Sequence, residues 1–167
     1  MSEATMALAA ELGKQLLARS WMMACAESCT GGLLAAAVTD IAGSSDWFDR
    51  GFVTYSNAAK IELLGVAPDT LEHFGAVSEE TAMEMAAGAL SVSHQAQFAI
   101  SSTGIAGPGG ATPGKPVGMV CFGFAQRVGS GLTTRAQTRI FQGDRHQVRA
   151  ASVAFALETA LGLISLR

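Results

Sequence analysis

The sequence is short of charge, of cysteine and of long apolar runs, and each shortage excludes a class of protein. Charged residues make up 15% of the 167 residues, and a net charge of −3 without any block of Lys or Arg argues against a nucleic-acid partner. The three cysteines lack the number and spacing of a disulfide framework or a zinc site, which predicts buried free thiols in a reducing compartment. No apolar run approaches the ~20 residues that cross a membrane. We therefore expect a cytoplasmic protein without a membrane, nucleic-acid or metal partner.

Apolar residues, in contrast, are abundant. Hydrophobic residues make up 49% of the chain. One domain, residues 1–167, is the simplest arrangement for this length, and it can bury roughly 70% of the surface that the unfolded chain exposes. Because few charges are available to cover the remaining surface, we expect part of the apolar area to be buried between subunits.

Leucine spacing, turn residues and capping residues predict an alternation of helices and strands. Gly129-Ser130-Gly131 is expected to join the last two strands as a hairpin, and Asp144 with Gln147 predicts the capping box of the final helix. The alternation indicates a three-layer α/β/α domain. The expected helices cover 4–19, 30–41, 56–64, 78–92 and 144–163, the expected strands cover 21–26, 50–55, 97–102, 117–126 and 132–141, and 65–77 is expected to be a connection.

The segment Ala26-Glu27-Ser28-Cys29-Thr30-Gly31-Gly32 lies between an expected strand and an expected helix. A helix N-terminus offers unpaired N–H groups and a partial positive charge, and glycine lets an anion approach the backbone closely. The segment is therefore typical of a site for a phosphate or an oxyanion. A simpler interpretation, in which Thr30 only caps the helix, explains the same residues.

A second glycine-rich segment, Gly109 to Lys115, has the G-x-x-x-x-G-K opening of a P-loop. A P-loop needs Ser or Thr next and then a helix, whereas Pro116 and an expected strand follow here. The sequence thus argues against a P-loop. The long loop follows a buried strand, where α/β proteins place their ligands, and it stays a candidate binding edge.

Lys60 is expected in the first turn of a helix that Ser56 or Asn57 caps. The helix dipole disfavours a cation there, and that field, like burial, would lower the pKa of the lysine. A neutral lysine can act as a general base and activate a serine. An exposed lysine at the same position would be an ordinary surface charge.

The other polar candidates each have a structural interpretation beside the chemical one. Ser45 lies in a turn that a simple loop cap explains, and the single tyrosine, Tyr55, ends a strand where its ring could pack at the rim. Arg139 and Arg145 could bind a phosphate through paired hydrogen bonds or remain solvated. The histidines lack metal-ligand spacing, and a Ser-His-Asp triad stays open although no G-x-S-x-G turn is present.

Five segments occur together in this order: Ala26–Gly32, Ala42–Ser45, Val53–Asn57 with Lys60, Gly75–Ser78, and Gly104–Pro108 with Lys115–Gly118. Together they resemble the CinA C-terminal domain family, whose bacterial members include nicotinamide mononucleotide deamidases, and the resemblance runs from about residue 8 to 161. The chain is similar to the stand-alone type without an extra N-terminal domain. The resemblance implies a homodimer and a mixed sheet of about five strands, which we expect to be mostly parallel.

The resemblance also implies a reaction, namely hydrolysis of the carboxamide of nicotinamide mononucleotide to the acid and ammonia in pyridine-nucleotide salvage, without a cofactor. It implies Ser45 as nucleophile, Lys60 as its base and Tyr55 as an aid to proton transfer. Ser28 is the alternative nucleophile. The expected substrate-positioning residues are Ser28, Thr103, the backbone N–H groups of Thr30, Gly31, Gly32 and Gly104, and Arg145 for the phosphate.

Two other functions stay open at this point. One is a nucleotide-binding module without catalysis, for which a ligand would raise the melting temperature without ammonia release. The other is a phosphotransferase that uses the glycine-rich loop, and such an enzyme would require Mg²⁺ and ATP.

Overall fold

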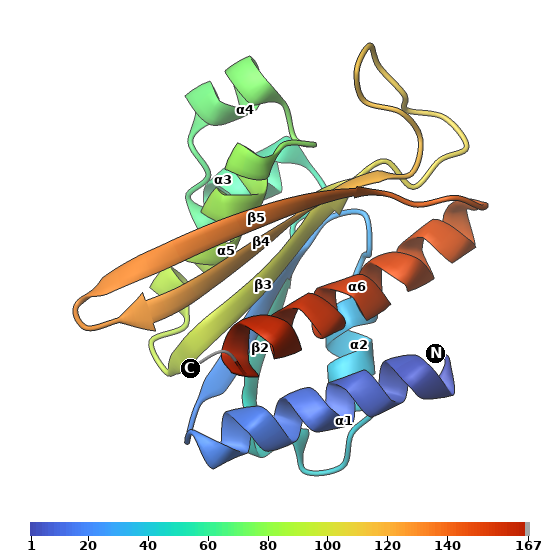
Figure 1. The fold of residues 1–167 in the computed structure, drawn as a ribbon. Coiled ribbons are helices and arrows are strands. Elements are labelled where there is room, and N and C mark those ends of the chain that lie inside the picture. Colours follow the sequence, from blue (N-terminus) through green and yellow to red (C-terminus); the bar gives the residue numbers. More distant parts are fainter. Residues whose placement is uncertain (166–167) are drawn as a thin grey trace.

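One five-stranded sheet carries helices on both of its faces (Figure 1). The computed structural model describes residues 1–165. The strand order across the sheet is β2-β1-β3-β4-β5. The strands are β1 (Met22–Glu27), β2 (Phe48–Val53), β3 (Ala96–Gly104), β4 (Met119–Val128) and β5 (Gly131–Ile140), and the helices are α1 (Glu3–Ala18), α2 (Leu33–Thr39), the 3-10 turn η1 (Ser44–Asp46), α3 (Asn57–Leu64), α4 (Pro68–Phe74), α5 (Glu79–Val92) and α6 (Arg145–Ser165).

The sheet is mixed, and its antiparallel part is the larger, so the expectation of a mostly parallel sheet is wrong. β1 runs parallel to β2 and β3, whereas β4 runs antiparallel to both β3 and β5. Parallel neighbours need a crossover that is usually a helix. The chain instead passes from β3 to β4 through the glycine-rich loop 105–118, which contains no helix. It then turns directly from β4 into β5 at Gly129 and Ser130, which confirms the predicted hairpin.

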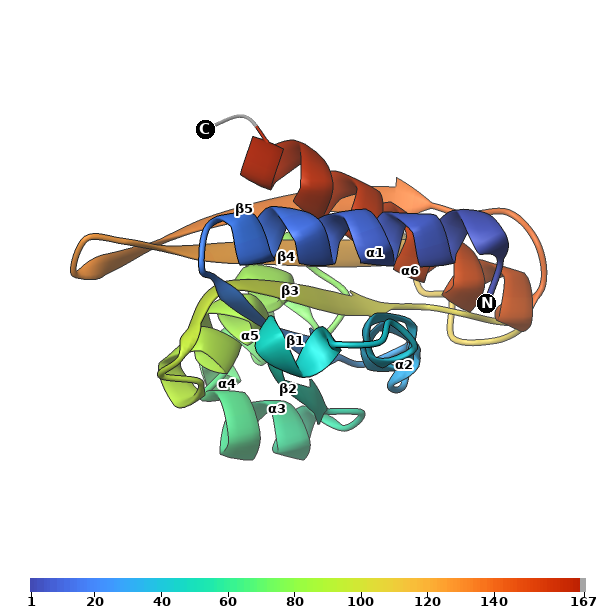
Figure 2. The same cartoon turned by 90° about the horizontal axis from the view of Figure 1, so that it is seen from below.

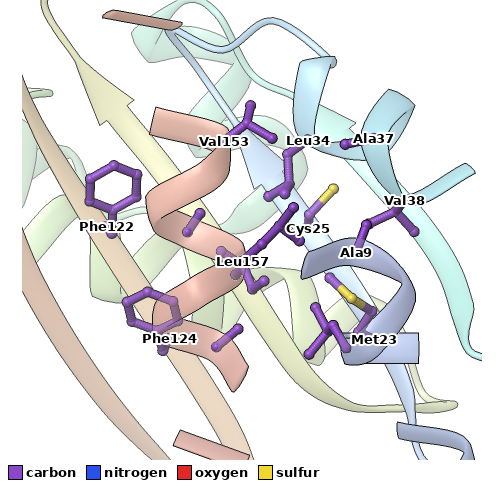
Figure 3. Packing of buried hydrophobic residues seen from close by; sticks show 14 of the residues in the cluster. Ala9, Met23, Cys25, Leu34, Ala37, Val38, Phe122, Phe124, Val153 and Leu157 are labelled. Carbon is purple, nitrogen blue, oxygen red and sulfur yellow. The ribbon is translucent and has the colours of Figure 1, made fainter. Parts of the chain in front are cut away.

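The helices divide between the two faces, which confirms the three-layer arrangement. α1 packs against α2 and α6 on one face, and α5 packs against α3 and α4 on the other (Figure 2). Neighbouring side chains of a strand point to opposite faces, and β1 contributes Met23 and Cys25 to one apolar core and Ala24 and Ala26 to the other. Figure 3 shows Met23 and Cys25 among side chains from α1, α2 and α6.

Two glycines hold α5 close to its neighbours. A Cβ atom on Gly123 of β4 would collide with the carbonyl oxygen of Ala82 in α5, and a Cβ atom on Gly88 of α5 would collide with the carbonyl oxygen of Leu64 in α3. Only glycine permits either approach. The contact at Gly88 fixes α3 against α5, and α3 is the helix that carries Lys60.

Two of the α-helices differ most from the sequence-based expectation. Helix α4 lies inside 65–77, which was expected to be a connection; Pro68 stands in its first turn, where a missing N–H costs nothing. Helix α2 begins at Leu33 instead of residue 30, because Gly31 and Gly32 adopt left-handed backbone conformations with φ of 57° and 98°.

Helix α6 is the longest helix that the structure describes. Its capping box is confirmed, since Asp144 Oδ1 accepts from the Gln147 N–H and Gln147 Oε1 accepts from the Asp144 N–H. By length and composition α6 is apolar enough to cross a membrane, a test that core helices also pass. It buries Val153 and Leu157 against the sheet and α1, as a core helix does (Figure 3).

Candidate active site

The expected site residues gather, with one exception, at a single edge of the sheet. β1, β2 and β3 are parallel and end there, between α3 and the first turn of α6 (Figure 1). Ligands of α/β proteins bind at this kind of edge. The residues at this edge are Ser28, Thr30, Gly31 and Gly32 after β1, Tyr55 after β2, Lys60 in α3, Thr103 and Gly104 at the end of β3, and Arg145 at the start of α6.

Lys60 and Ser28 form a buried pair at this edge. The Nζ atom of Lys60 lies 3.1 Å from Ser28 Oγ and donates to the Thr54 carbonyl oxygen at 2.9 Å. Lys60 is 1% exposed and Ser28 is 8% exposed. Burial lowers the pKa of Lys60, because a desolvated ammonium is disfavoured. A lysine with a lowered pKa beside a serine hydroxyl is the arrangement that activates a nucleophile.

Ser45 is the exception. It lies in η1, before β2, and its side chain is exposed. The carbonyl oxygen of Trp47, two residues later, accepts from the Met23 N–H at the start of β1. Ser28 follows the other end of that strand, so the length of β1, roughly 17 Å at about 3.3 Å per residue, separates the two regions. Within one chain the structure therefore brings Ser28, and not Ser45, to Lys60.

The carboxylate of Glu27 occupies the N-terminus of α2. Glu27 is fully buried, and its Oε1 accepts from the Leu34 N–H at 2.8 Å while its Oε2 accepts from the Ala35 N–H at 3.0 Å. Thr30 Oγ1 donates to Glu27 Oε1 at 2.7 Å and also contacts Ser102 Oγ at 2.7 Å. Thr30 is thus not a helix cap. The N-terminus of α2, where the sequence predicted a phosphate or an oxyanion, is occupied by a carboxylate of the protein itself.

Arg149 holds the turn that follows Ser28, and the sequence analysis missed it. Its Nε donates to the Cys29 carbonyl oxygen and its Nη2 to the Thr30 carbonyl oxygen, both at 3.0 Å. A Cβ atom on Gly31 would lie 3.3 Å from Nη2, so glycine leaves room for the guanidinium. The sequence could have indicated Arg149, because Arg145 and Arg149 are four residues apart and lie on the same face of one helix.

Arg145 and Tyr55 form the exposed rim of the site. Arg145 Nη2 donates to Tyr55 Oη at 2.9 Å, and Nη1 donates to the Gly107 carbonyl oxygen at 2.8 Å. Tyr55 is 62% exposed. The second arginine candidate, Arg139, lies near the end of β5, two strands from Gly104 in the same row of the sheet, and its guanidinium packs 5.0 Å from the centre of the Phe155 ring.

Thr103 and Gly104 are already engaged by the fold. Thr103 Oγ1 donates to the Ala76 carbonyl oxygen at 2.7 Å. A Cβ atom on Gly104 would lie 2.7 Å from the carbonyl oxygen of Met119, so this glycine permits the close pairing of β3 with β4.

The thiols and possible metal ligands add no further reactive group. All three cysteines are free and buried, as predicted, and burial raises the pKa of Cys29 to about 12, which keeps it a neutral thiol. Within residues 1–165, no three His, Cys, Asp or Glu side chains lie together as metal ligands would.

Comparison with known proteins gives one family. The CinA C-terminal domain matches residues 5–164. "Nicotinamide-nucleotide amidohydrolase PncC" of Enterobacter agglomerans is 58% identical over 154 residues, covering 92% of each chain, and the protein of that name in Escherichia coli K12 is 51% identical over 92% of this chain and 91% of its own. The crystal structure of competence/damage inducible protein CihA from Agrobacterium tumefaciens is similar with a TM-score of 0.90 and 45% identity, covering 98% of this chain and 97% of that one.

Replacing Glu27 by glutamine should destabilise the protein. Glutamine has one acceptor oxygen, so part of the set of N–H and O–H donors around Glu27 loses its partner. Hydrogen bonds to a charged group contribute about 1.5–3 kcal/mol each, and we expect Glu27→Gln to lower the free energy of unfolding by about 2–4 kcal/mol. Urea denaturation measures this, with Glu72→Gln, on the exposed face of α4, as control. A loss no larger than that of the control would contradict the role of Glu27.

Proposed function

The chain belongs to the CinA C-terminal domain family, and from this membership we propose that it hydrolyses the carboxamide of nicotinamide mononucleotide to nicotinic acid mononucleotide and ammonia. The printed names of relatives that are 51–58% identical over nearly the whole chain support this activity. The observation that supports amide chemistry in this chain is the buried Lys60–Ser28 pair, which has a possible base 3.1 Å from a possible nucleophile.

We propose Ser28 as the nucleophile and Lys60 as its base. In the sequence analysis Ser45 was the preferred nucleophile and Ser28 the alternative. Neutral Lys60 accepts the hydroxyl proton as Ser28 Oγ bonds to the carboxamide carbon. The ammonium then returns this proton to the departing nitrogen, and ammonia leaves. The resulting ester on Ser28 is hydrolysed by water, whose proton Lys60 accepts in turn. The acid is released and Ser28 regains its proton, so the reaction consumes only water and substrate.

The rim of the site fits the phosphate of the substrate. Arg145 is exposed, and its contacts with Tyr55 and Gly107 hold the guanidinium at the mouth of the site. The N-terminus of α2 is taken by Glu27, so an arginine is the better candidate for an anion than that helix end. Thr30, Gly32 and Gly104 stay proposed backbone contacts of the substrate, whereas the N–H of Gly31, the other expected contact, donates to the Ser28 carbonyl oxygen. Tyr55 stays a proposed aid to proton transfer.

We further propose that the protein is a cytoplasmic homodimer. Its free thiols fit a reducing compartment. Exposed apolar side chains near the end of β2 and on α3 and α4, including Val53 (51% exposed), Leu63 (48%) and Phe74 (49%), offer surface that a second subunit could bury.

The purified protein should release ammonia from nicotinamide mononucleotide without any added cofactor. Because Ser28 and Lys60 supply the nucleophile and the base, the rate should be unchanged by EDTA. An enzyme-coupled ammonia assay with and without EDTA measures this. Loss of activity in EDTA with recovery on adding zinc would contradict the mechanism. Thermal stabilisation by the nucleotide without ammonia would favour a binding module, and a requirement for Mg²⁺ and ATP would favour a phosphotransferase.

Arg145→Gln should reduce the advantage of the mononucleotide over nicotinamide riboside, which lacks the phosphate. Each charge-assisted hydrogen bond contributes about 1.5–3 kcal/mol, so kcat/KM for the mononucleotide should fall about 10- to 100-fold. The value for the riboside should stay close to that of the wild type. Arg139→Gln is the matched control, because Arg139 lies over Phe155 and should affect neither substrate. An equal fall for both substrates would place the phosphate elsewhere.

Ser28 and Lys60 should act as a unit, so their losses should not add. Ser28→Ala and Lys60→Ala should each nearly abolish turnover, and the double variant should be little worse. Lys60→Arg should not restore activity, because a guanidinium stays protonated. In the wild type, kcat/KM should rise with pH through the lowered pKa of Lys60, since only the neutral amine accepts a proton.

Ser45→Ala decides between the two serines. If Ser28 attacks, this variant should keep most of its turnover, because Ser45 lies at the other edge of the sheet in the same chain. An inactive Ser45→Ala together with an active Ser28→Ala would return the nucleophile's role to Ser45.

A further inference from the structure

Thr54 has a hydroxyl group without a partner at the edge where the site lies. The residue is fully buried, and its Oγ1 is the only buried side-chain oxygen or nitrogen of residues 1–165 that makes no hydrogen bond. Buried polar groups of native proteins are nearly always paired, and an unpaired one lowers stability. The remaining polar atoms of Thr54 are paired, because its N–H donates to the Glu27 carbonyl oxygen and its carbonyl oxygen accepts from Lys60.

Strand register places this hydroxyl beside the proposed nucleophile. Glu27 pairs with Val53 in the parallel ladder, so Ser28 and Thr54 are the next pair. Parallel strands lie about 4.8 Å apart, and paired residues project their side chains from the same face. Phe52, two residues before Thr54, packs on the core that faces α5, as Ala26 does two residues before Ser28. Thr54 and Ser28 therefore share the face from which Lys60 approaches.

We propose that the Thr54 hydroxyl is a substrate contact that donates to the carbonyl oxygen of the reacting carboxamide. This inference rests on the proposed function. Ser28 Oγ attacks the carbon of that carbonyl group, and negative charge then develops on its oxygen. Thr54 is held beside Ser28, because its N–H donates to the Glu27 carbonyl oxygen and its carbonyl oxygen accepts from Lys60. Since the residue is fully buried in the free protein, the substrate meets this hydroxyl by displacing the side chains that cover it. The site thus keeps one hydroxyl unpaired in the free protein and pairs it in the transition state.

Thr54→Val tests the proposal, because valine has the shape of threonine without the hydroxyl. We expect kcat for nicotinamide mononucleotide to fall about 10- to 100-fold with little change in KM. The melting temperature should stay the same or rise, since the variant removes an unpaired polar group. Thr54→Ser, which restores the hydroxyl, should recover most of kcat. A merely structural threonine would lose stability and activity together.

Thr81→Val is the matched control. Thr81 is also fully buried, but its Oγ1 donates to the Gly75 carbonyl oxygen at 2.8 Å, so the variant should have a lower melting temperature and nearly unchanged kcat. Wild-type kcat in Thr54→Val would overturn the proposal, and so would a lowered melting temperature, which would indicate a structural partner for the hydroxyl. Absence of ammonia release by the wild type would instead refute the proposed function itself.

Discussion

The carboxylate of Glu27 at the N-terminus of α2 is the interaction on which the site depends. It satisfies two N–H groups of the helix and the hydroxyl of Thr30, and thereby fixes the path of the chain from β1 into α2. Since neighbouring side chains of a strand alternate, a carboxylate held on the α2 face leaves Ser28 on the opposite face. That face is the one from which Lys60 reaches Ser28. The position of the serine is thus a consequence of the burial of the glutamate.

Lys60, unlike Glu27, contributes little to the stability of the fold. Its ammonium is desolvated, and burial lowers its pKa, so the buried lysine adds little to stability. Its proposed role as a base accounts for its position. The fold accommodates it by holding α3 firmly. Gly88 brings the end of α3 against α5, Ser56 caps its start by accepting from the Ala59 N–H, and the Thr54 carbonyl oxygen accepts from Nζ. A rigid surrounding of this kind would keep the proposed base preorganised for the reaction.

The layers, the hairpin and the capping box could be predicted from local patterns, because periodicity and capping act over a few residues. The direction of β4 was not predicted, since it depends on the absence of a crossover helix in the loop 105–118. The role of Glu27 was missed for a related reason: capping rules treat short polar residues at the helix end, whereas this carboxylate reaches the helix from the preceding strand. Lys60 was identified by its conflict with the helix dipole, but its serine partner follows from strand pairing across the sheet, which no local spacing reveals.

Helix α6 stabilises the turn at Cys29 and Thr30, which follows Ser28. The turn at Cys29 and Thr30 is short and glycine-rich, and such segments usually open by local unfolding. Arg149 ties both carbonyl groups to a helix whose other residues form much of one core. If the turn opens because Arg149 moves away with α6, the packing of α6 against α1 and the sheet is disrupted as well. Amide hydrogens around the turn should therefore exchange with solvent through the cooperative opening of α6 and its core, and the proposed reactive centre should keep its arrangement until the fold itself is lost.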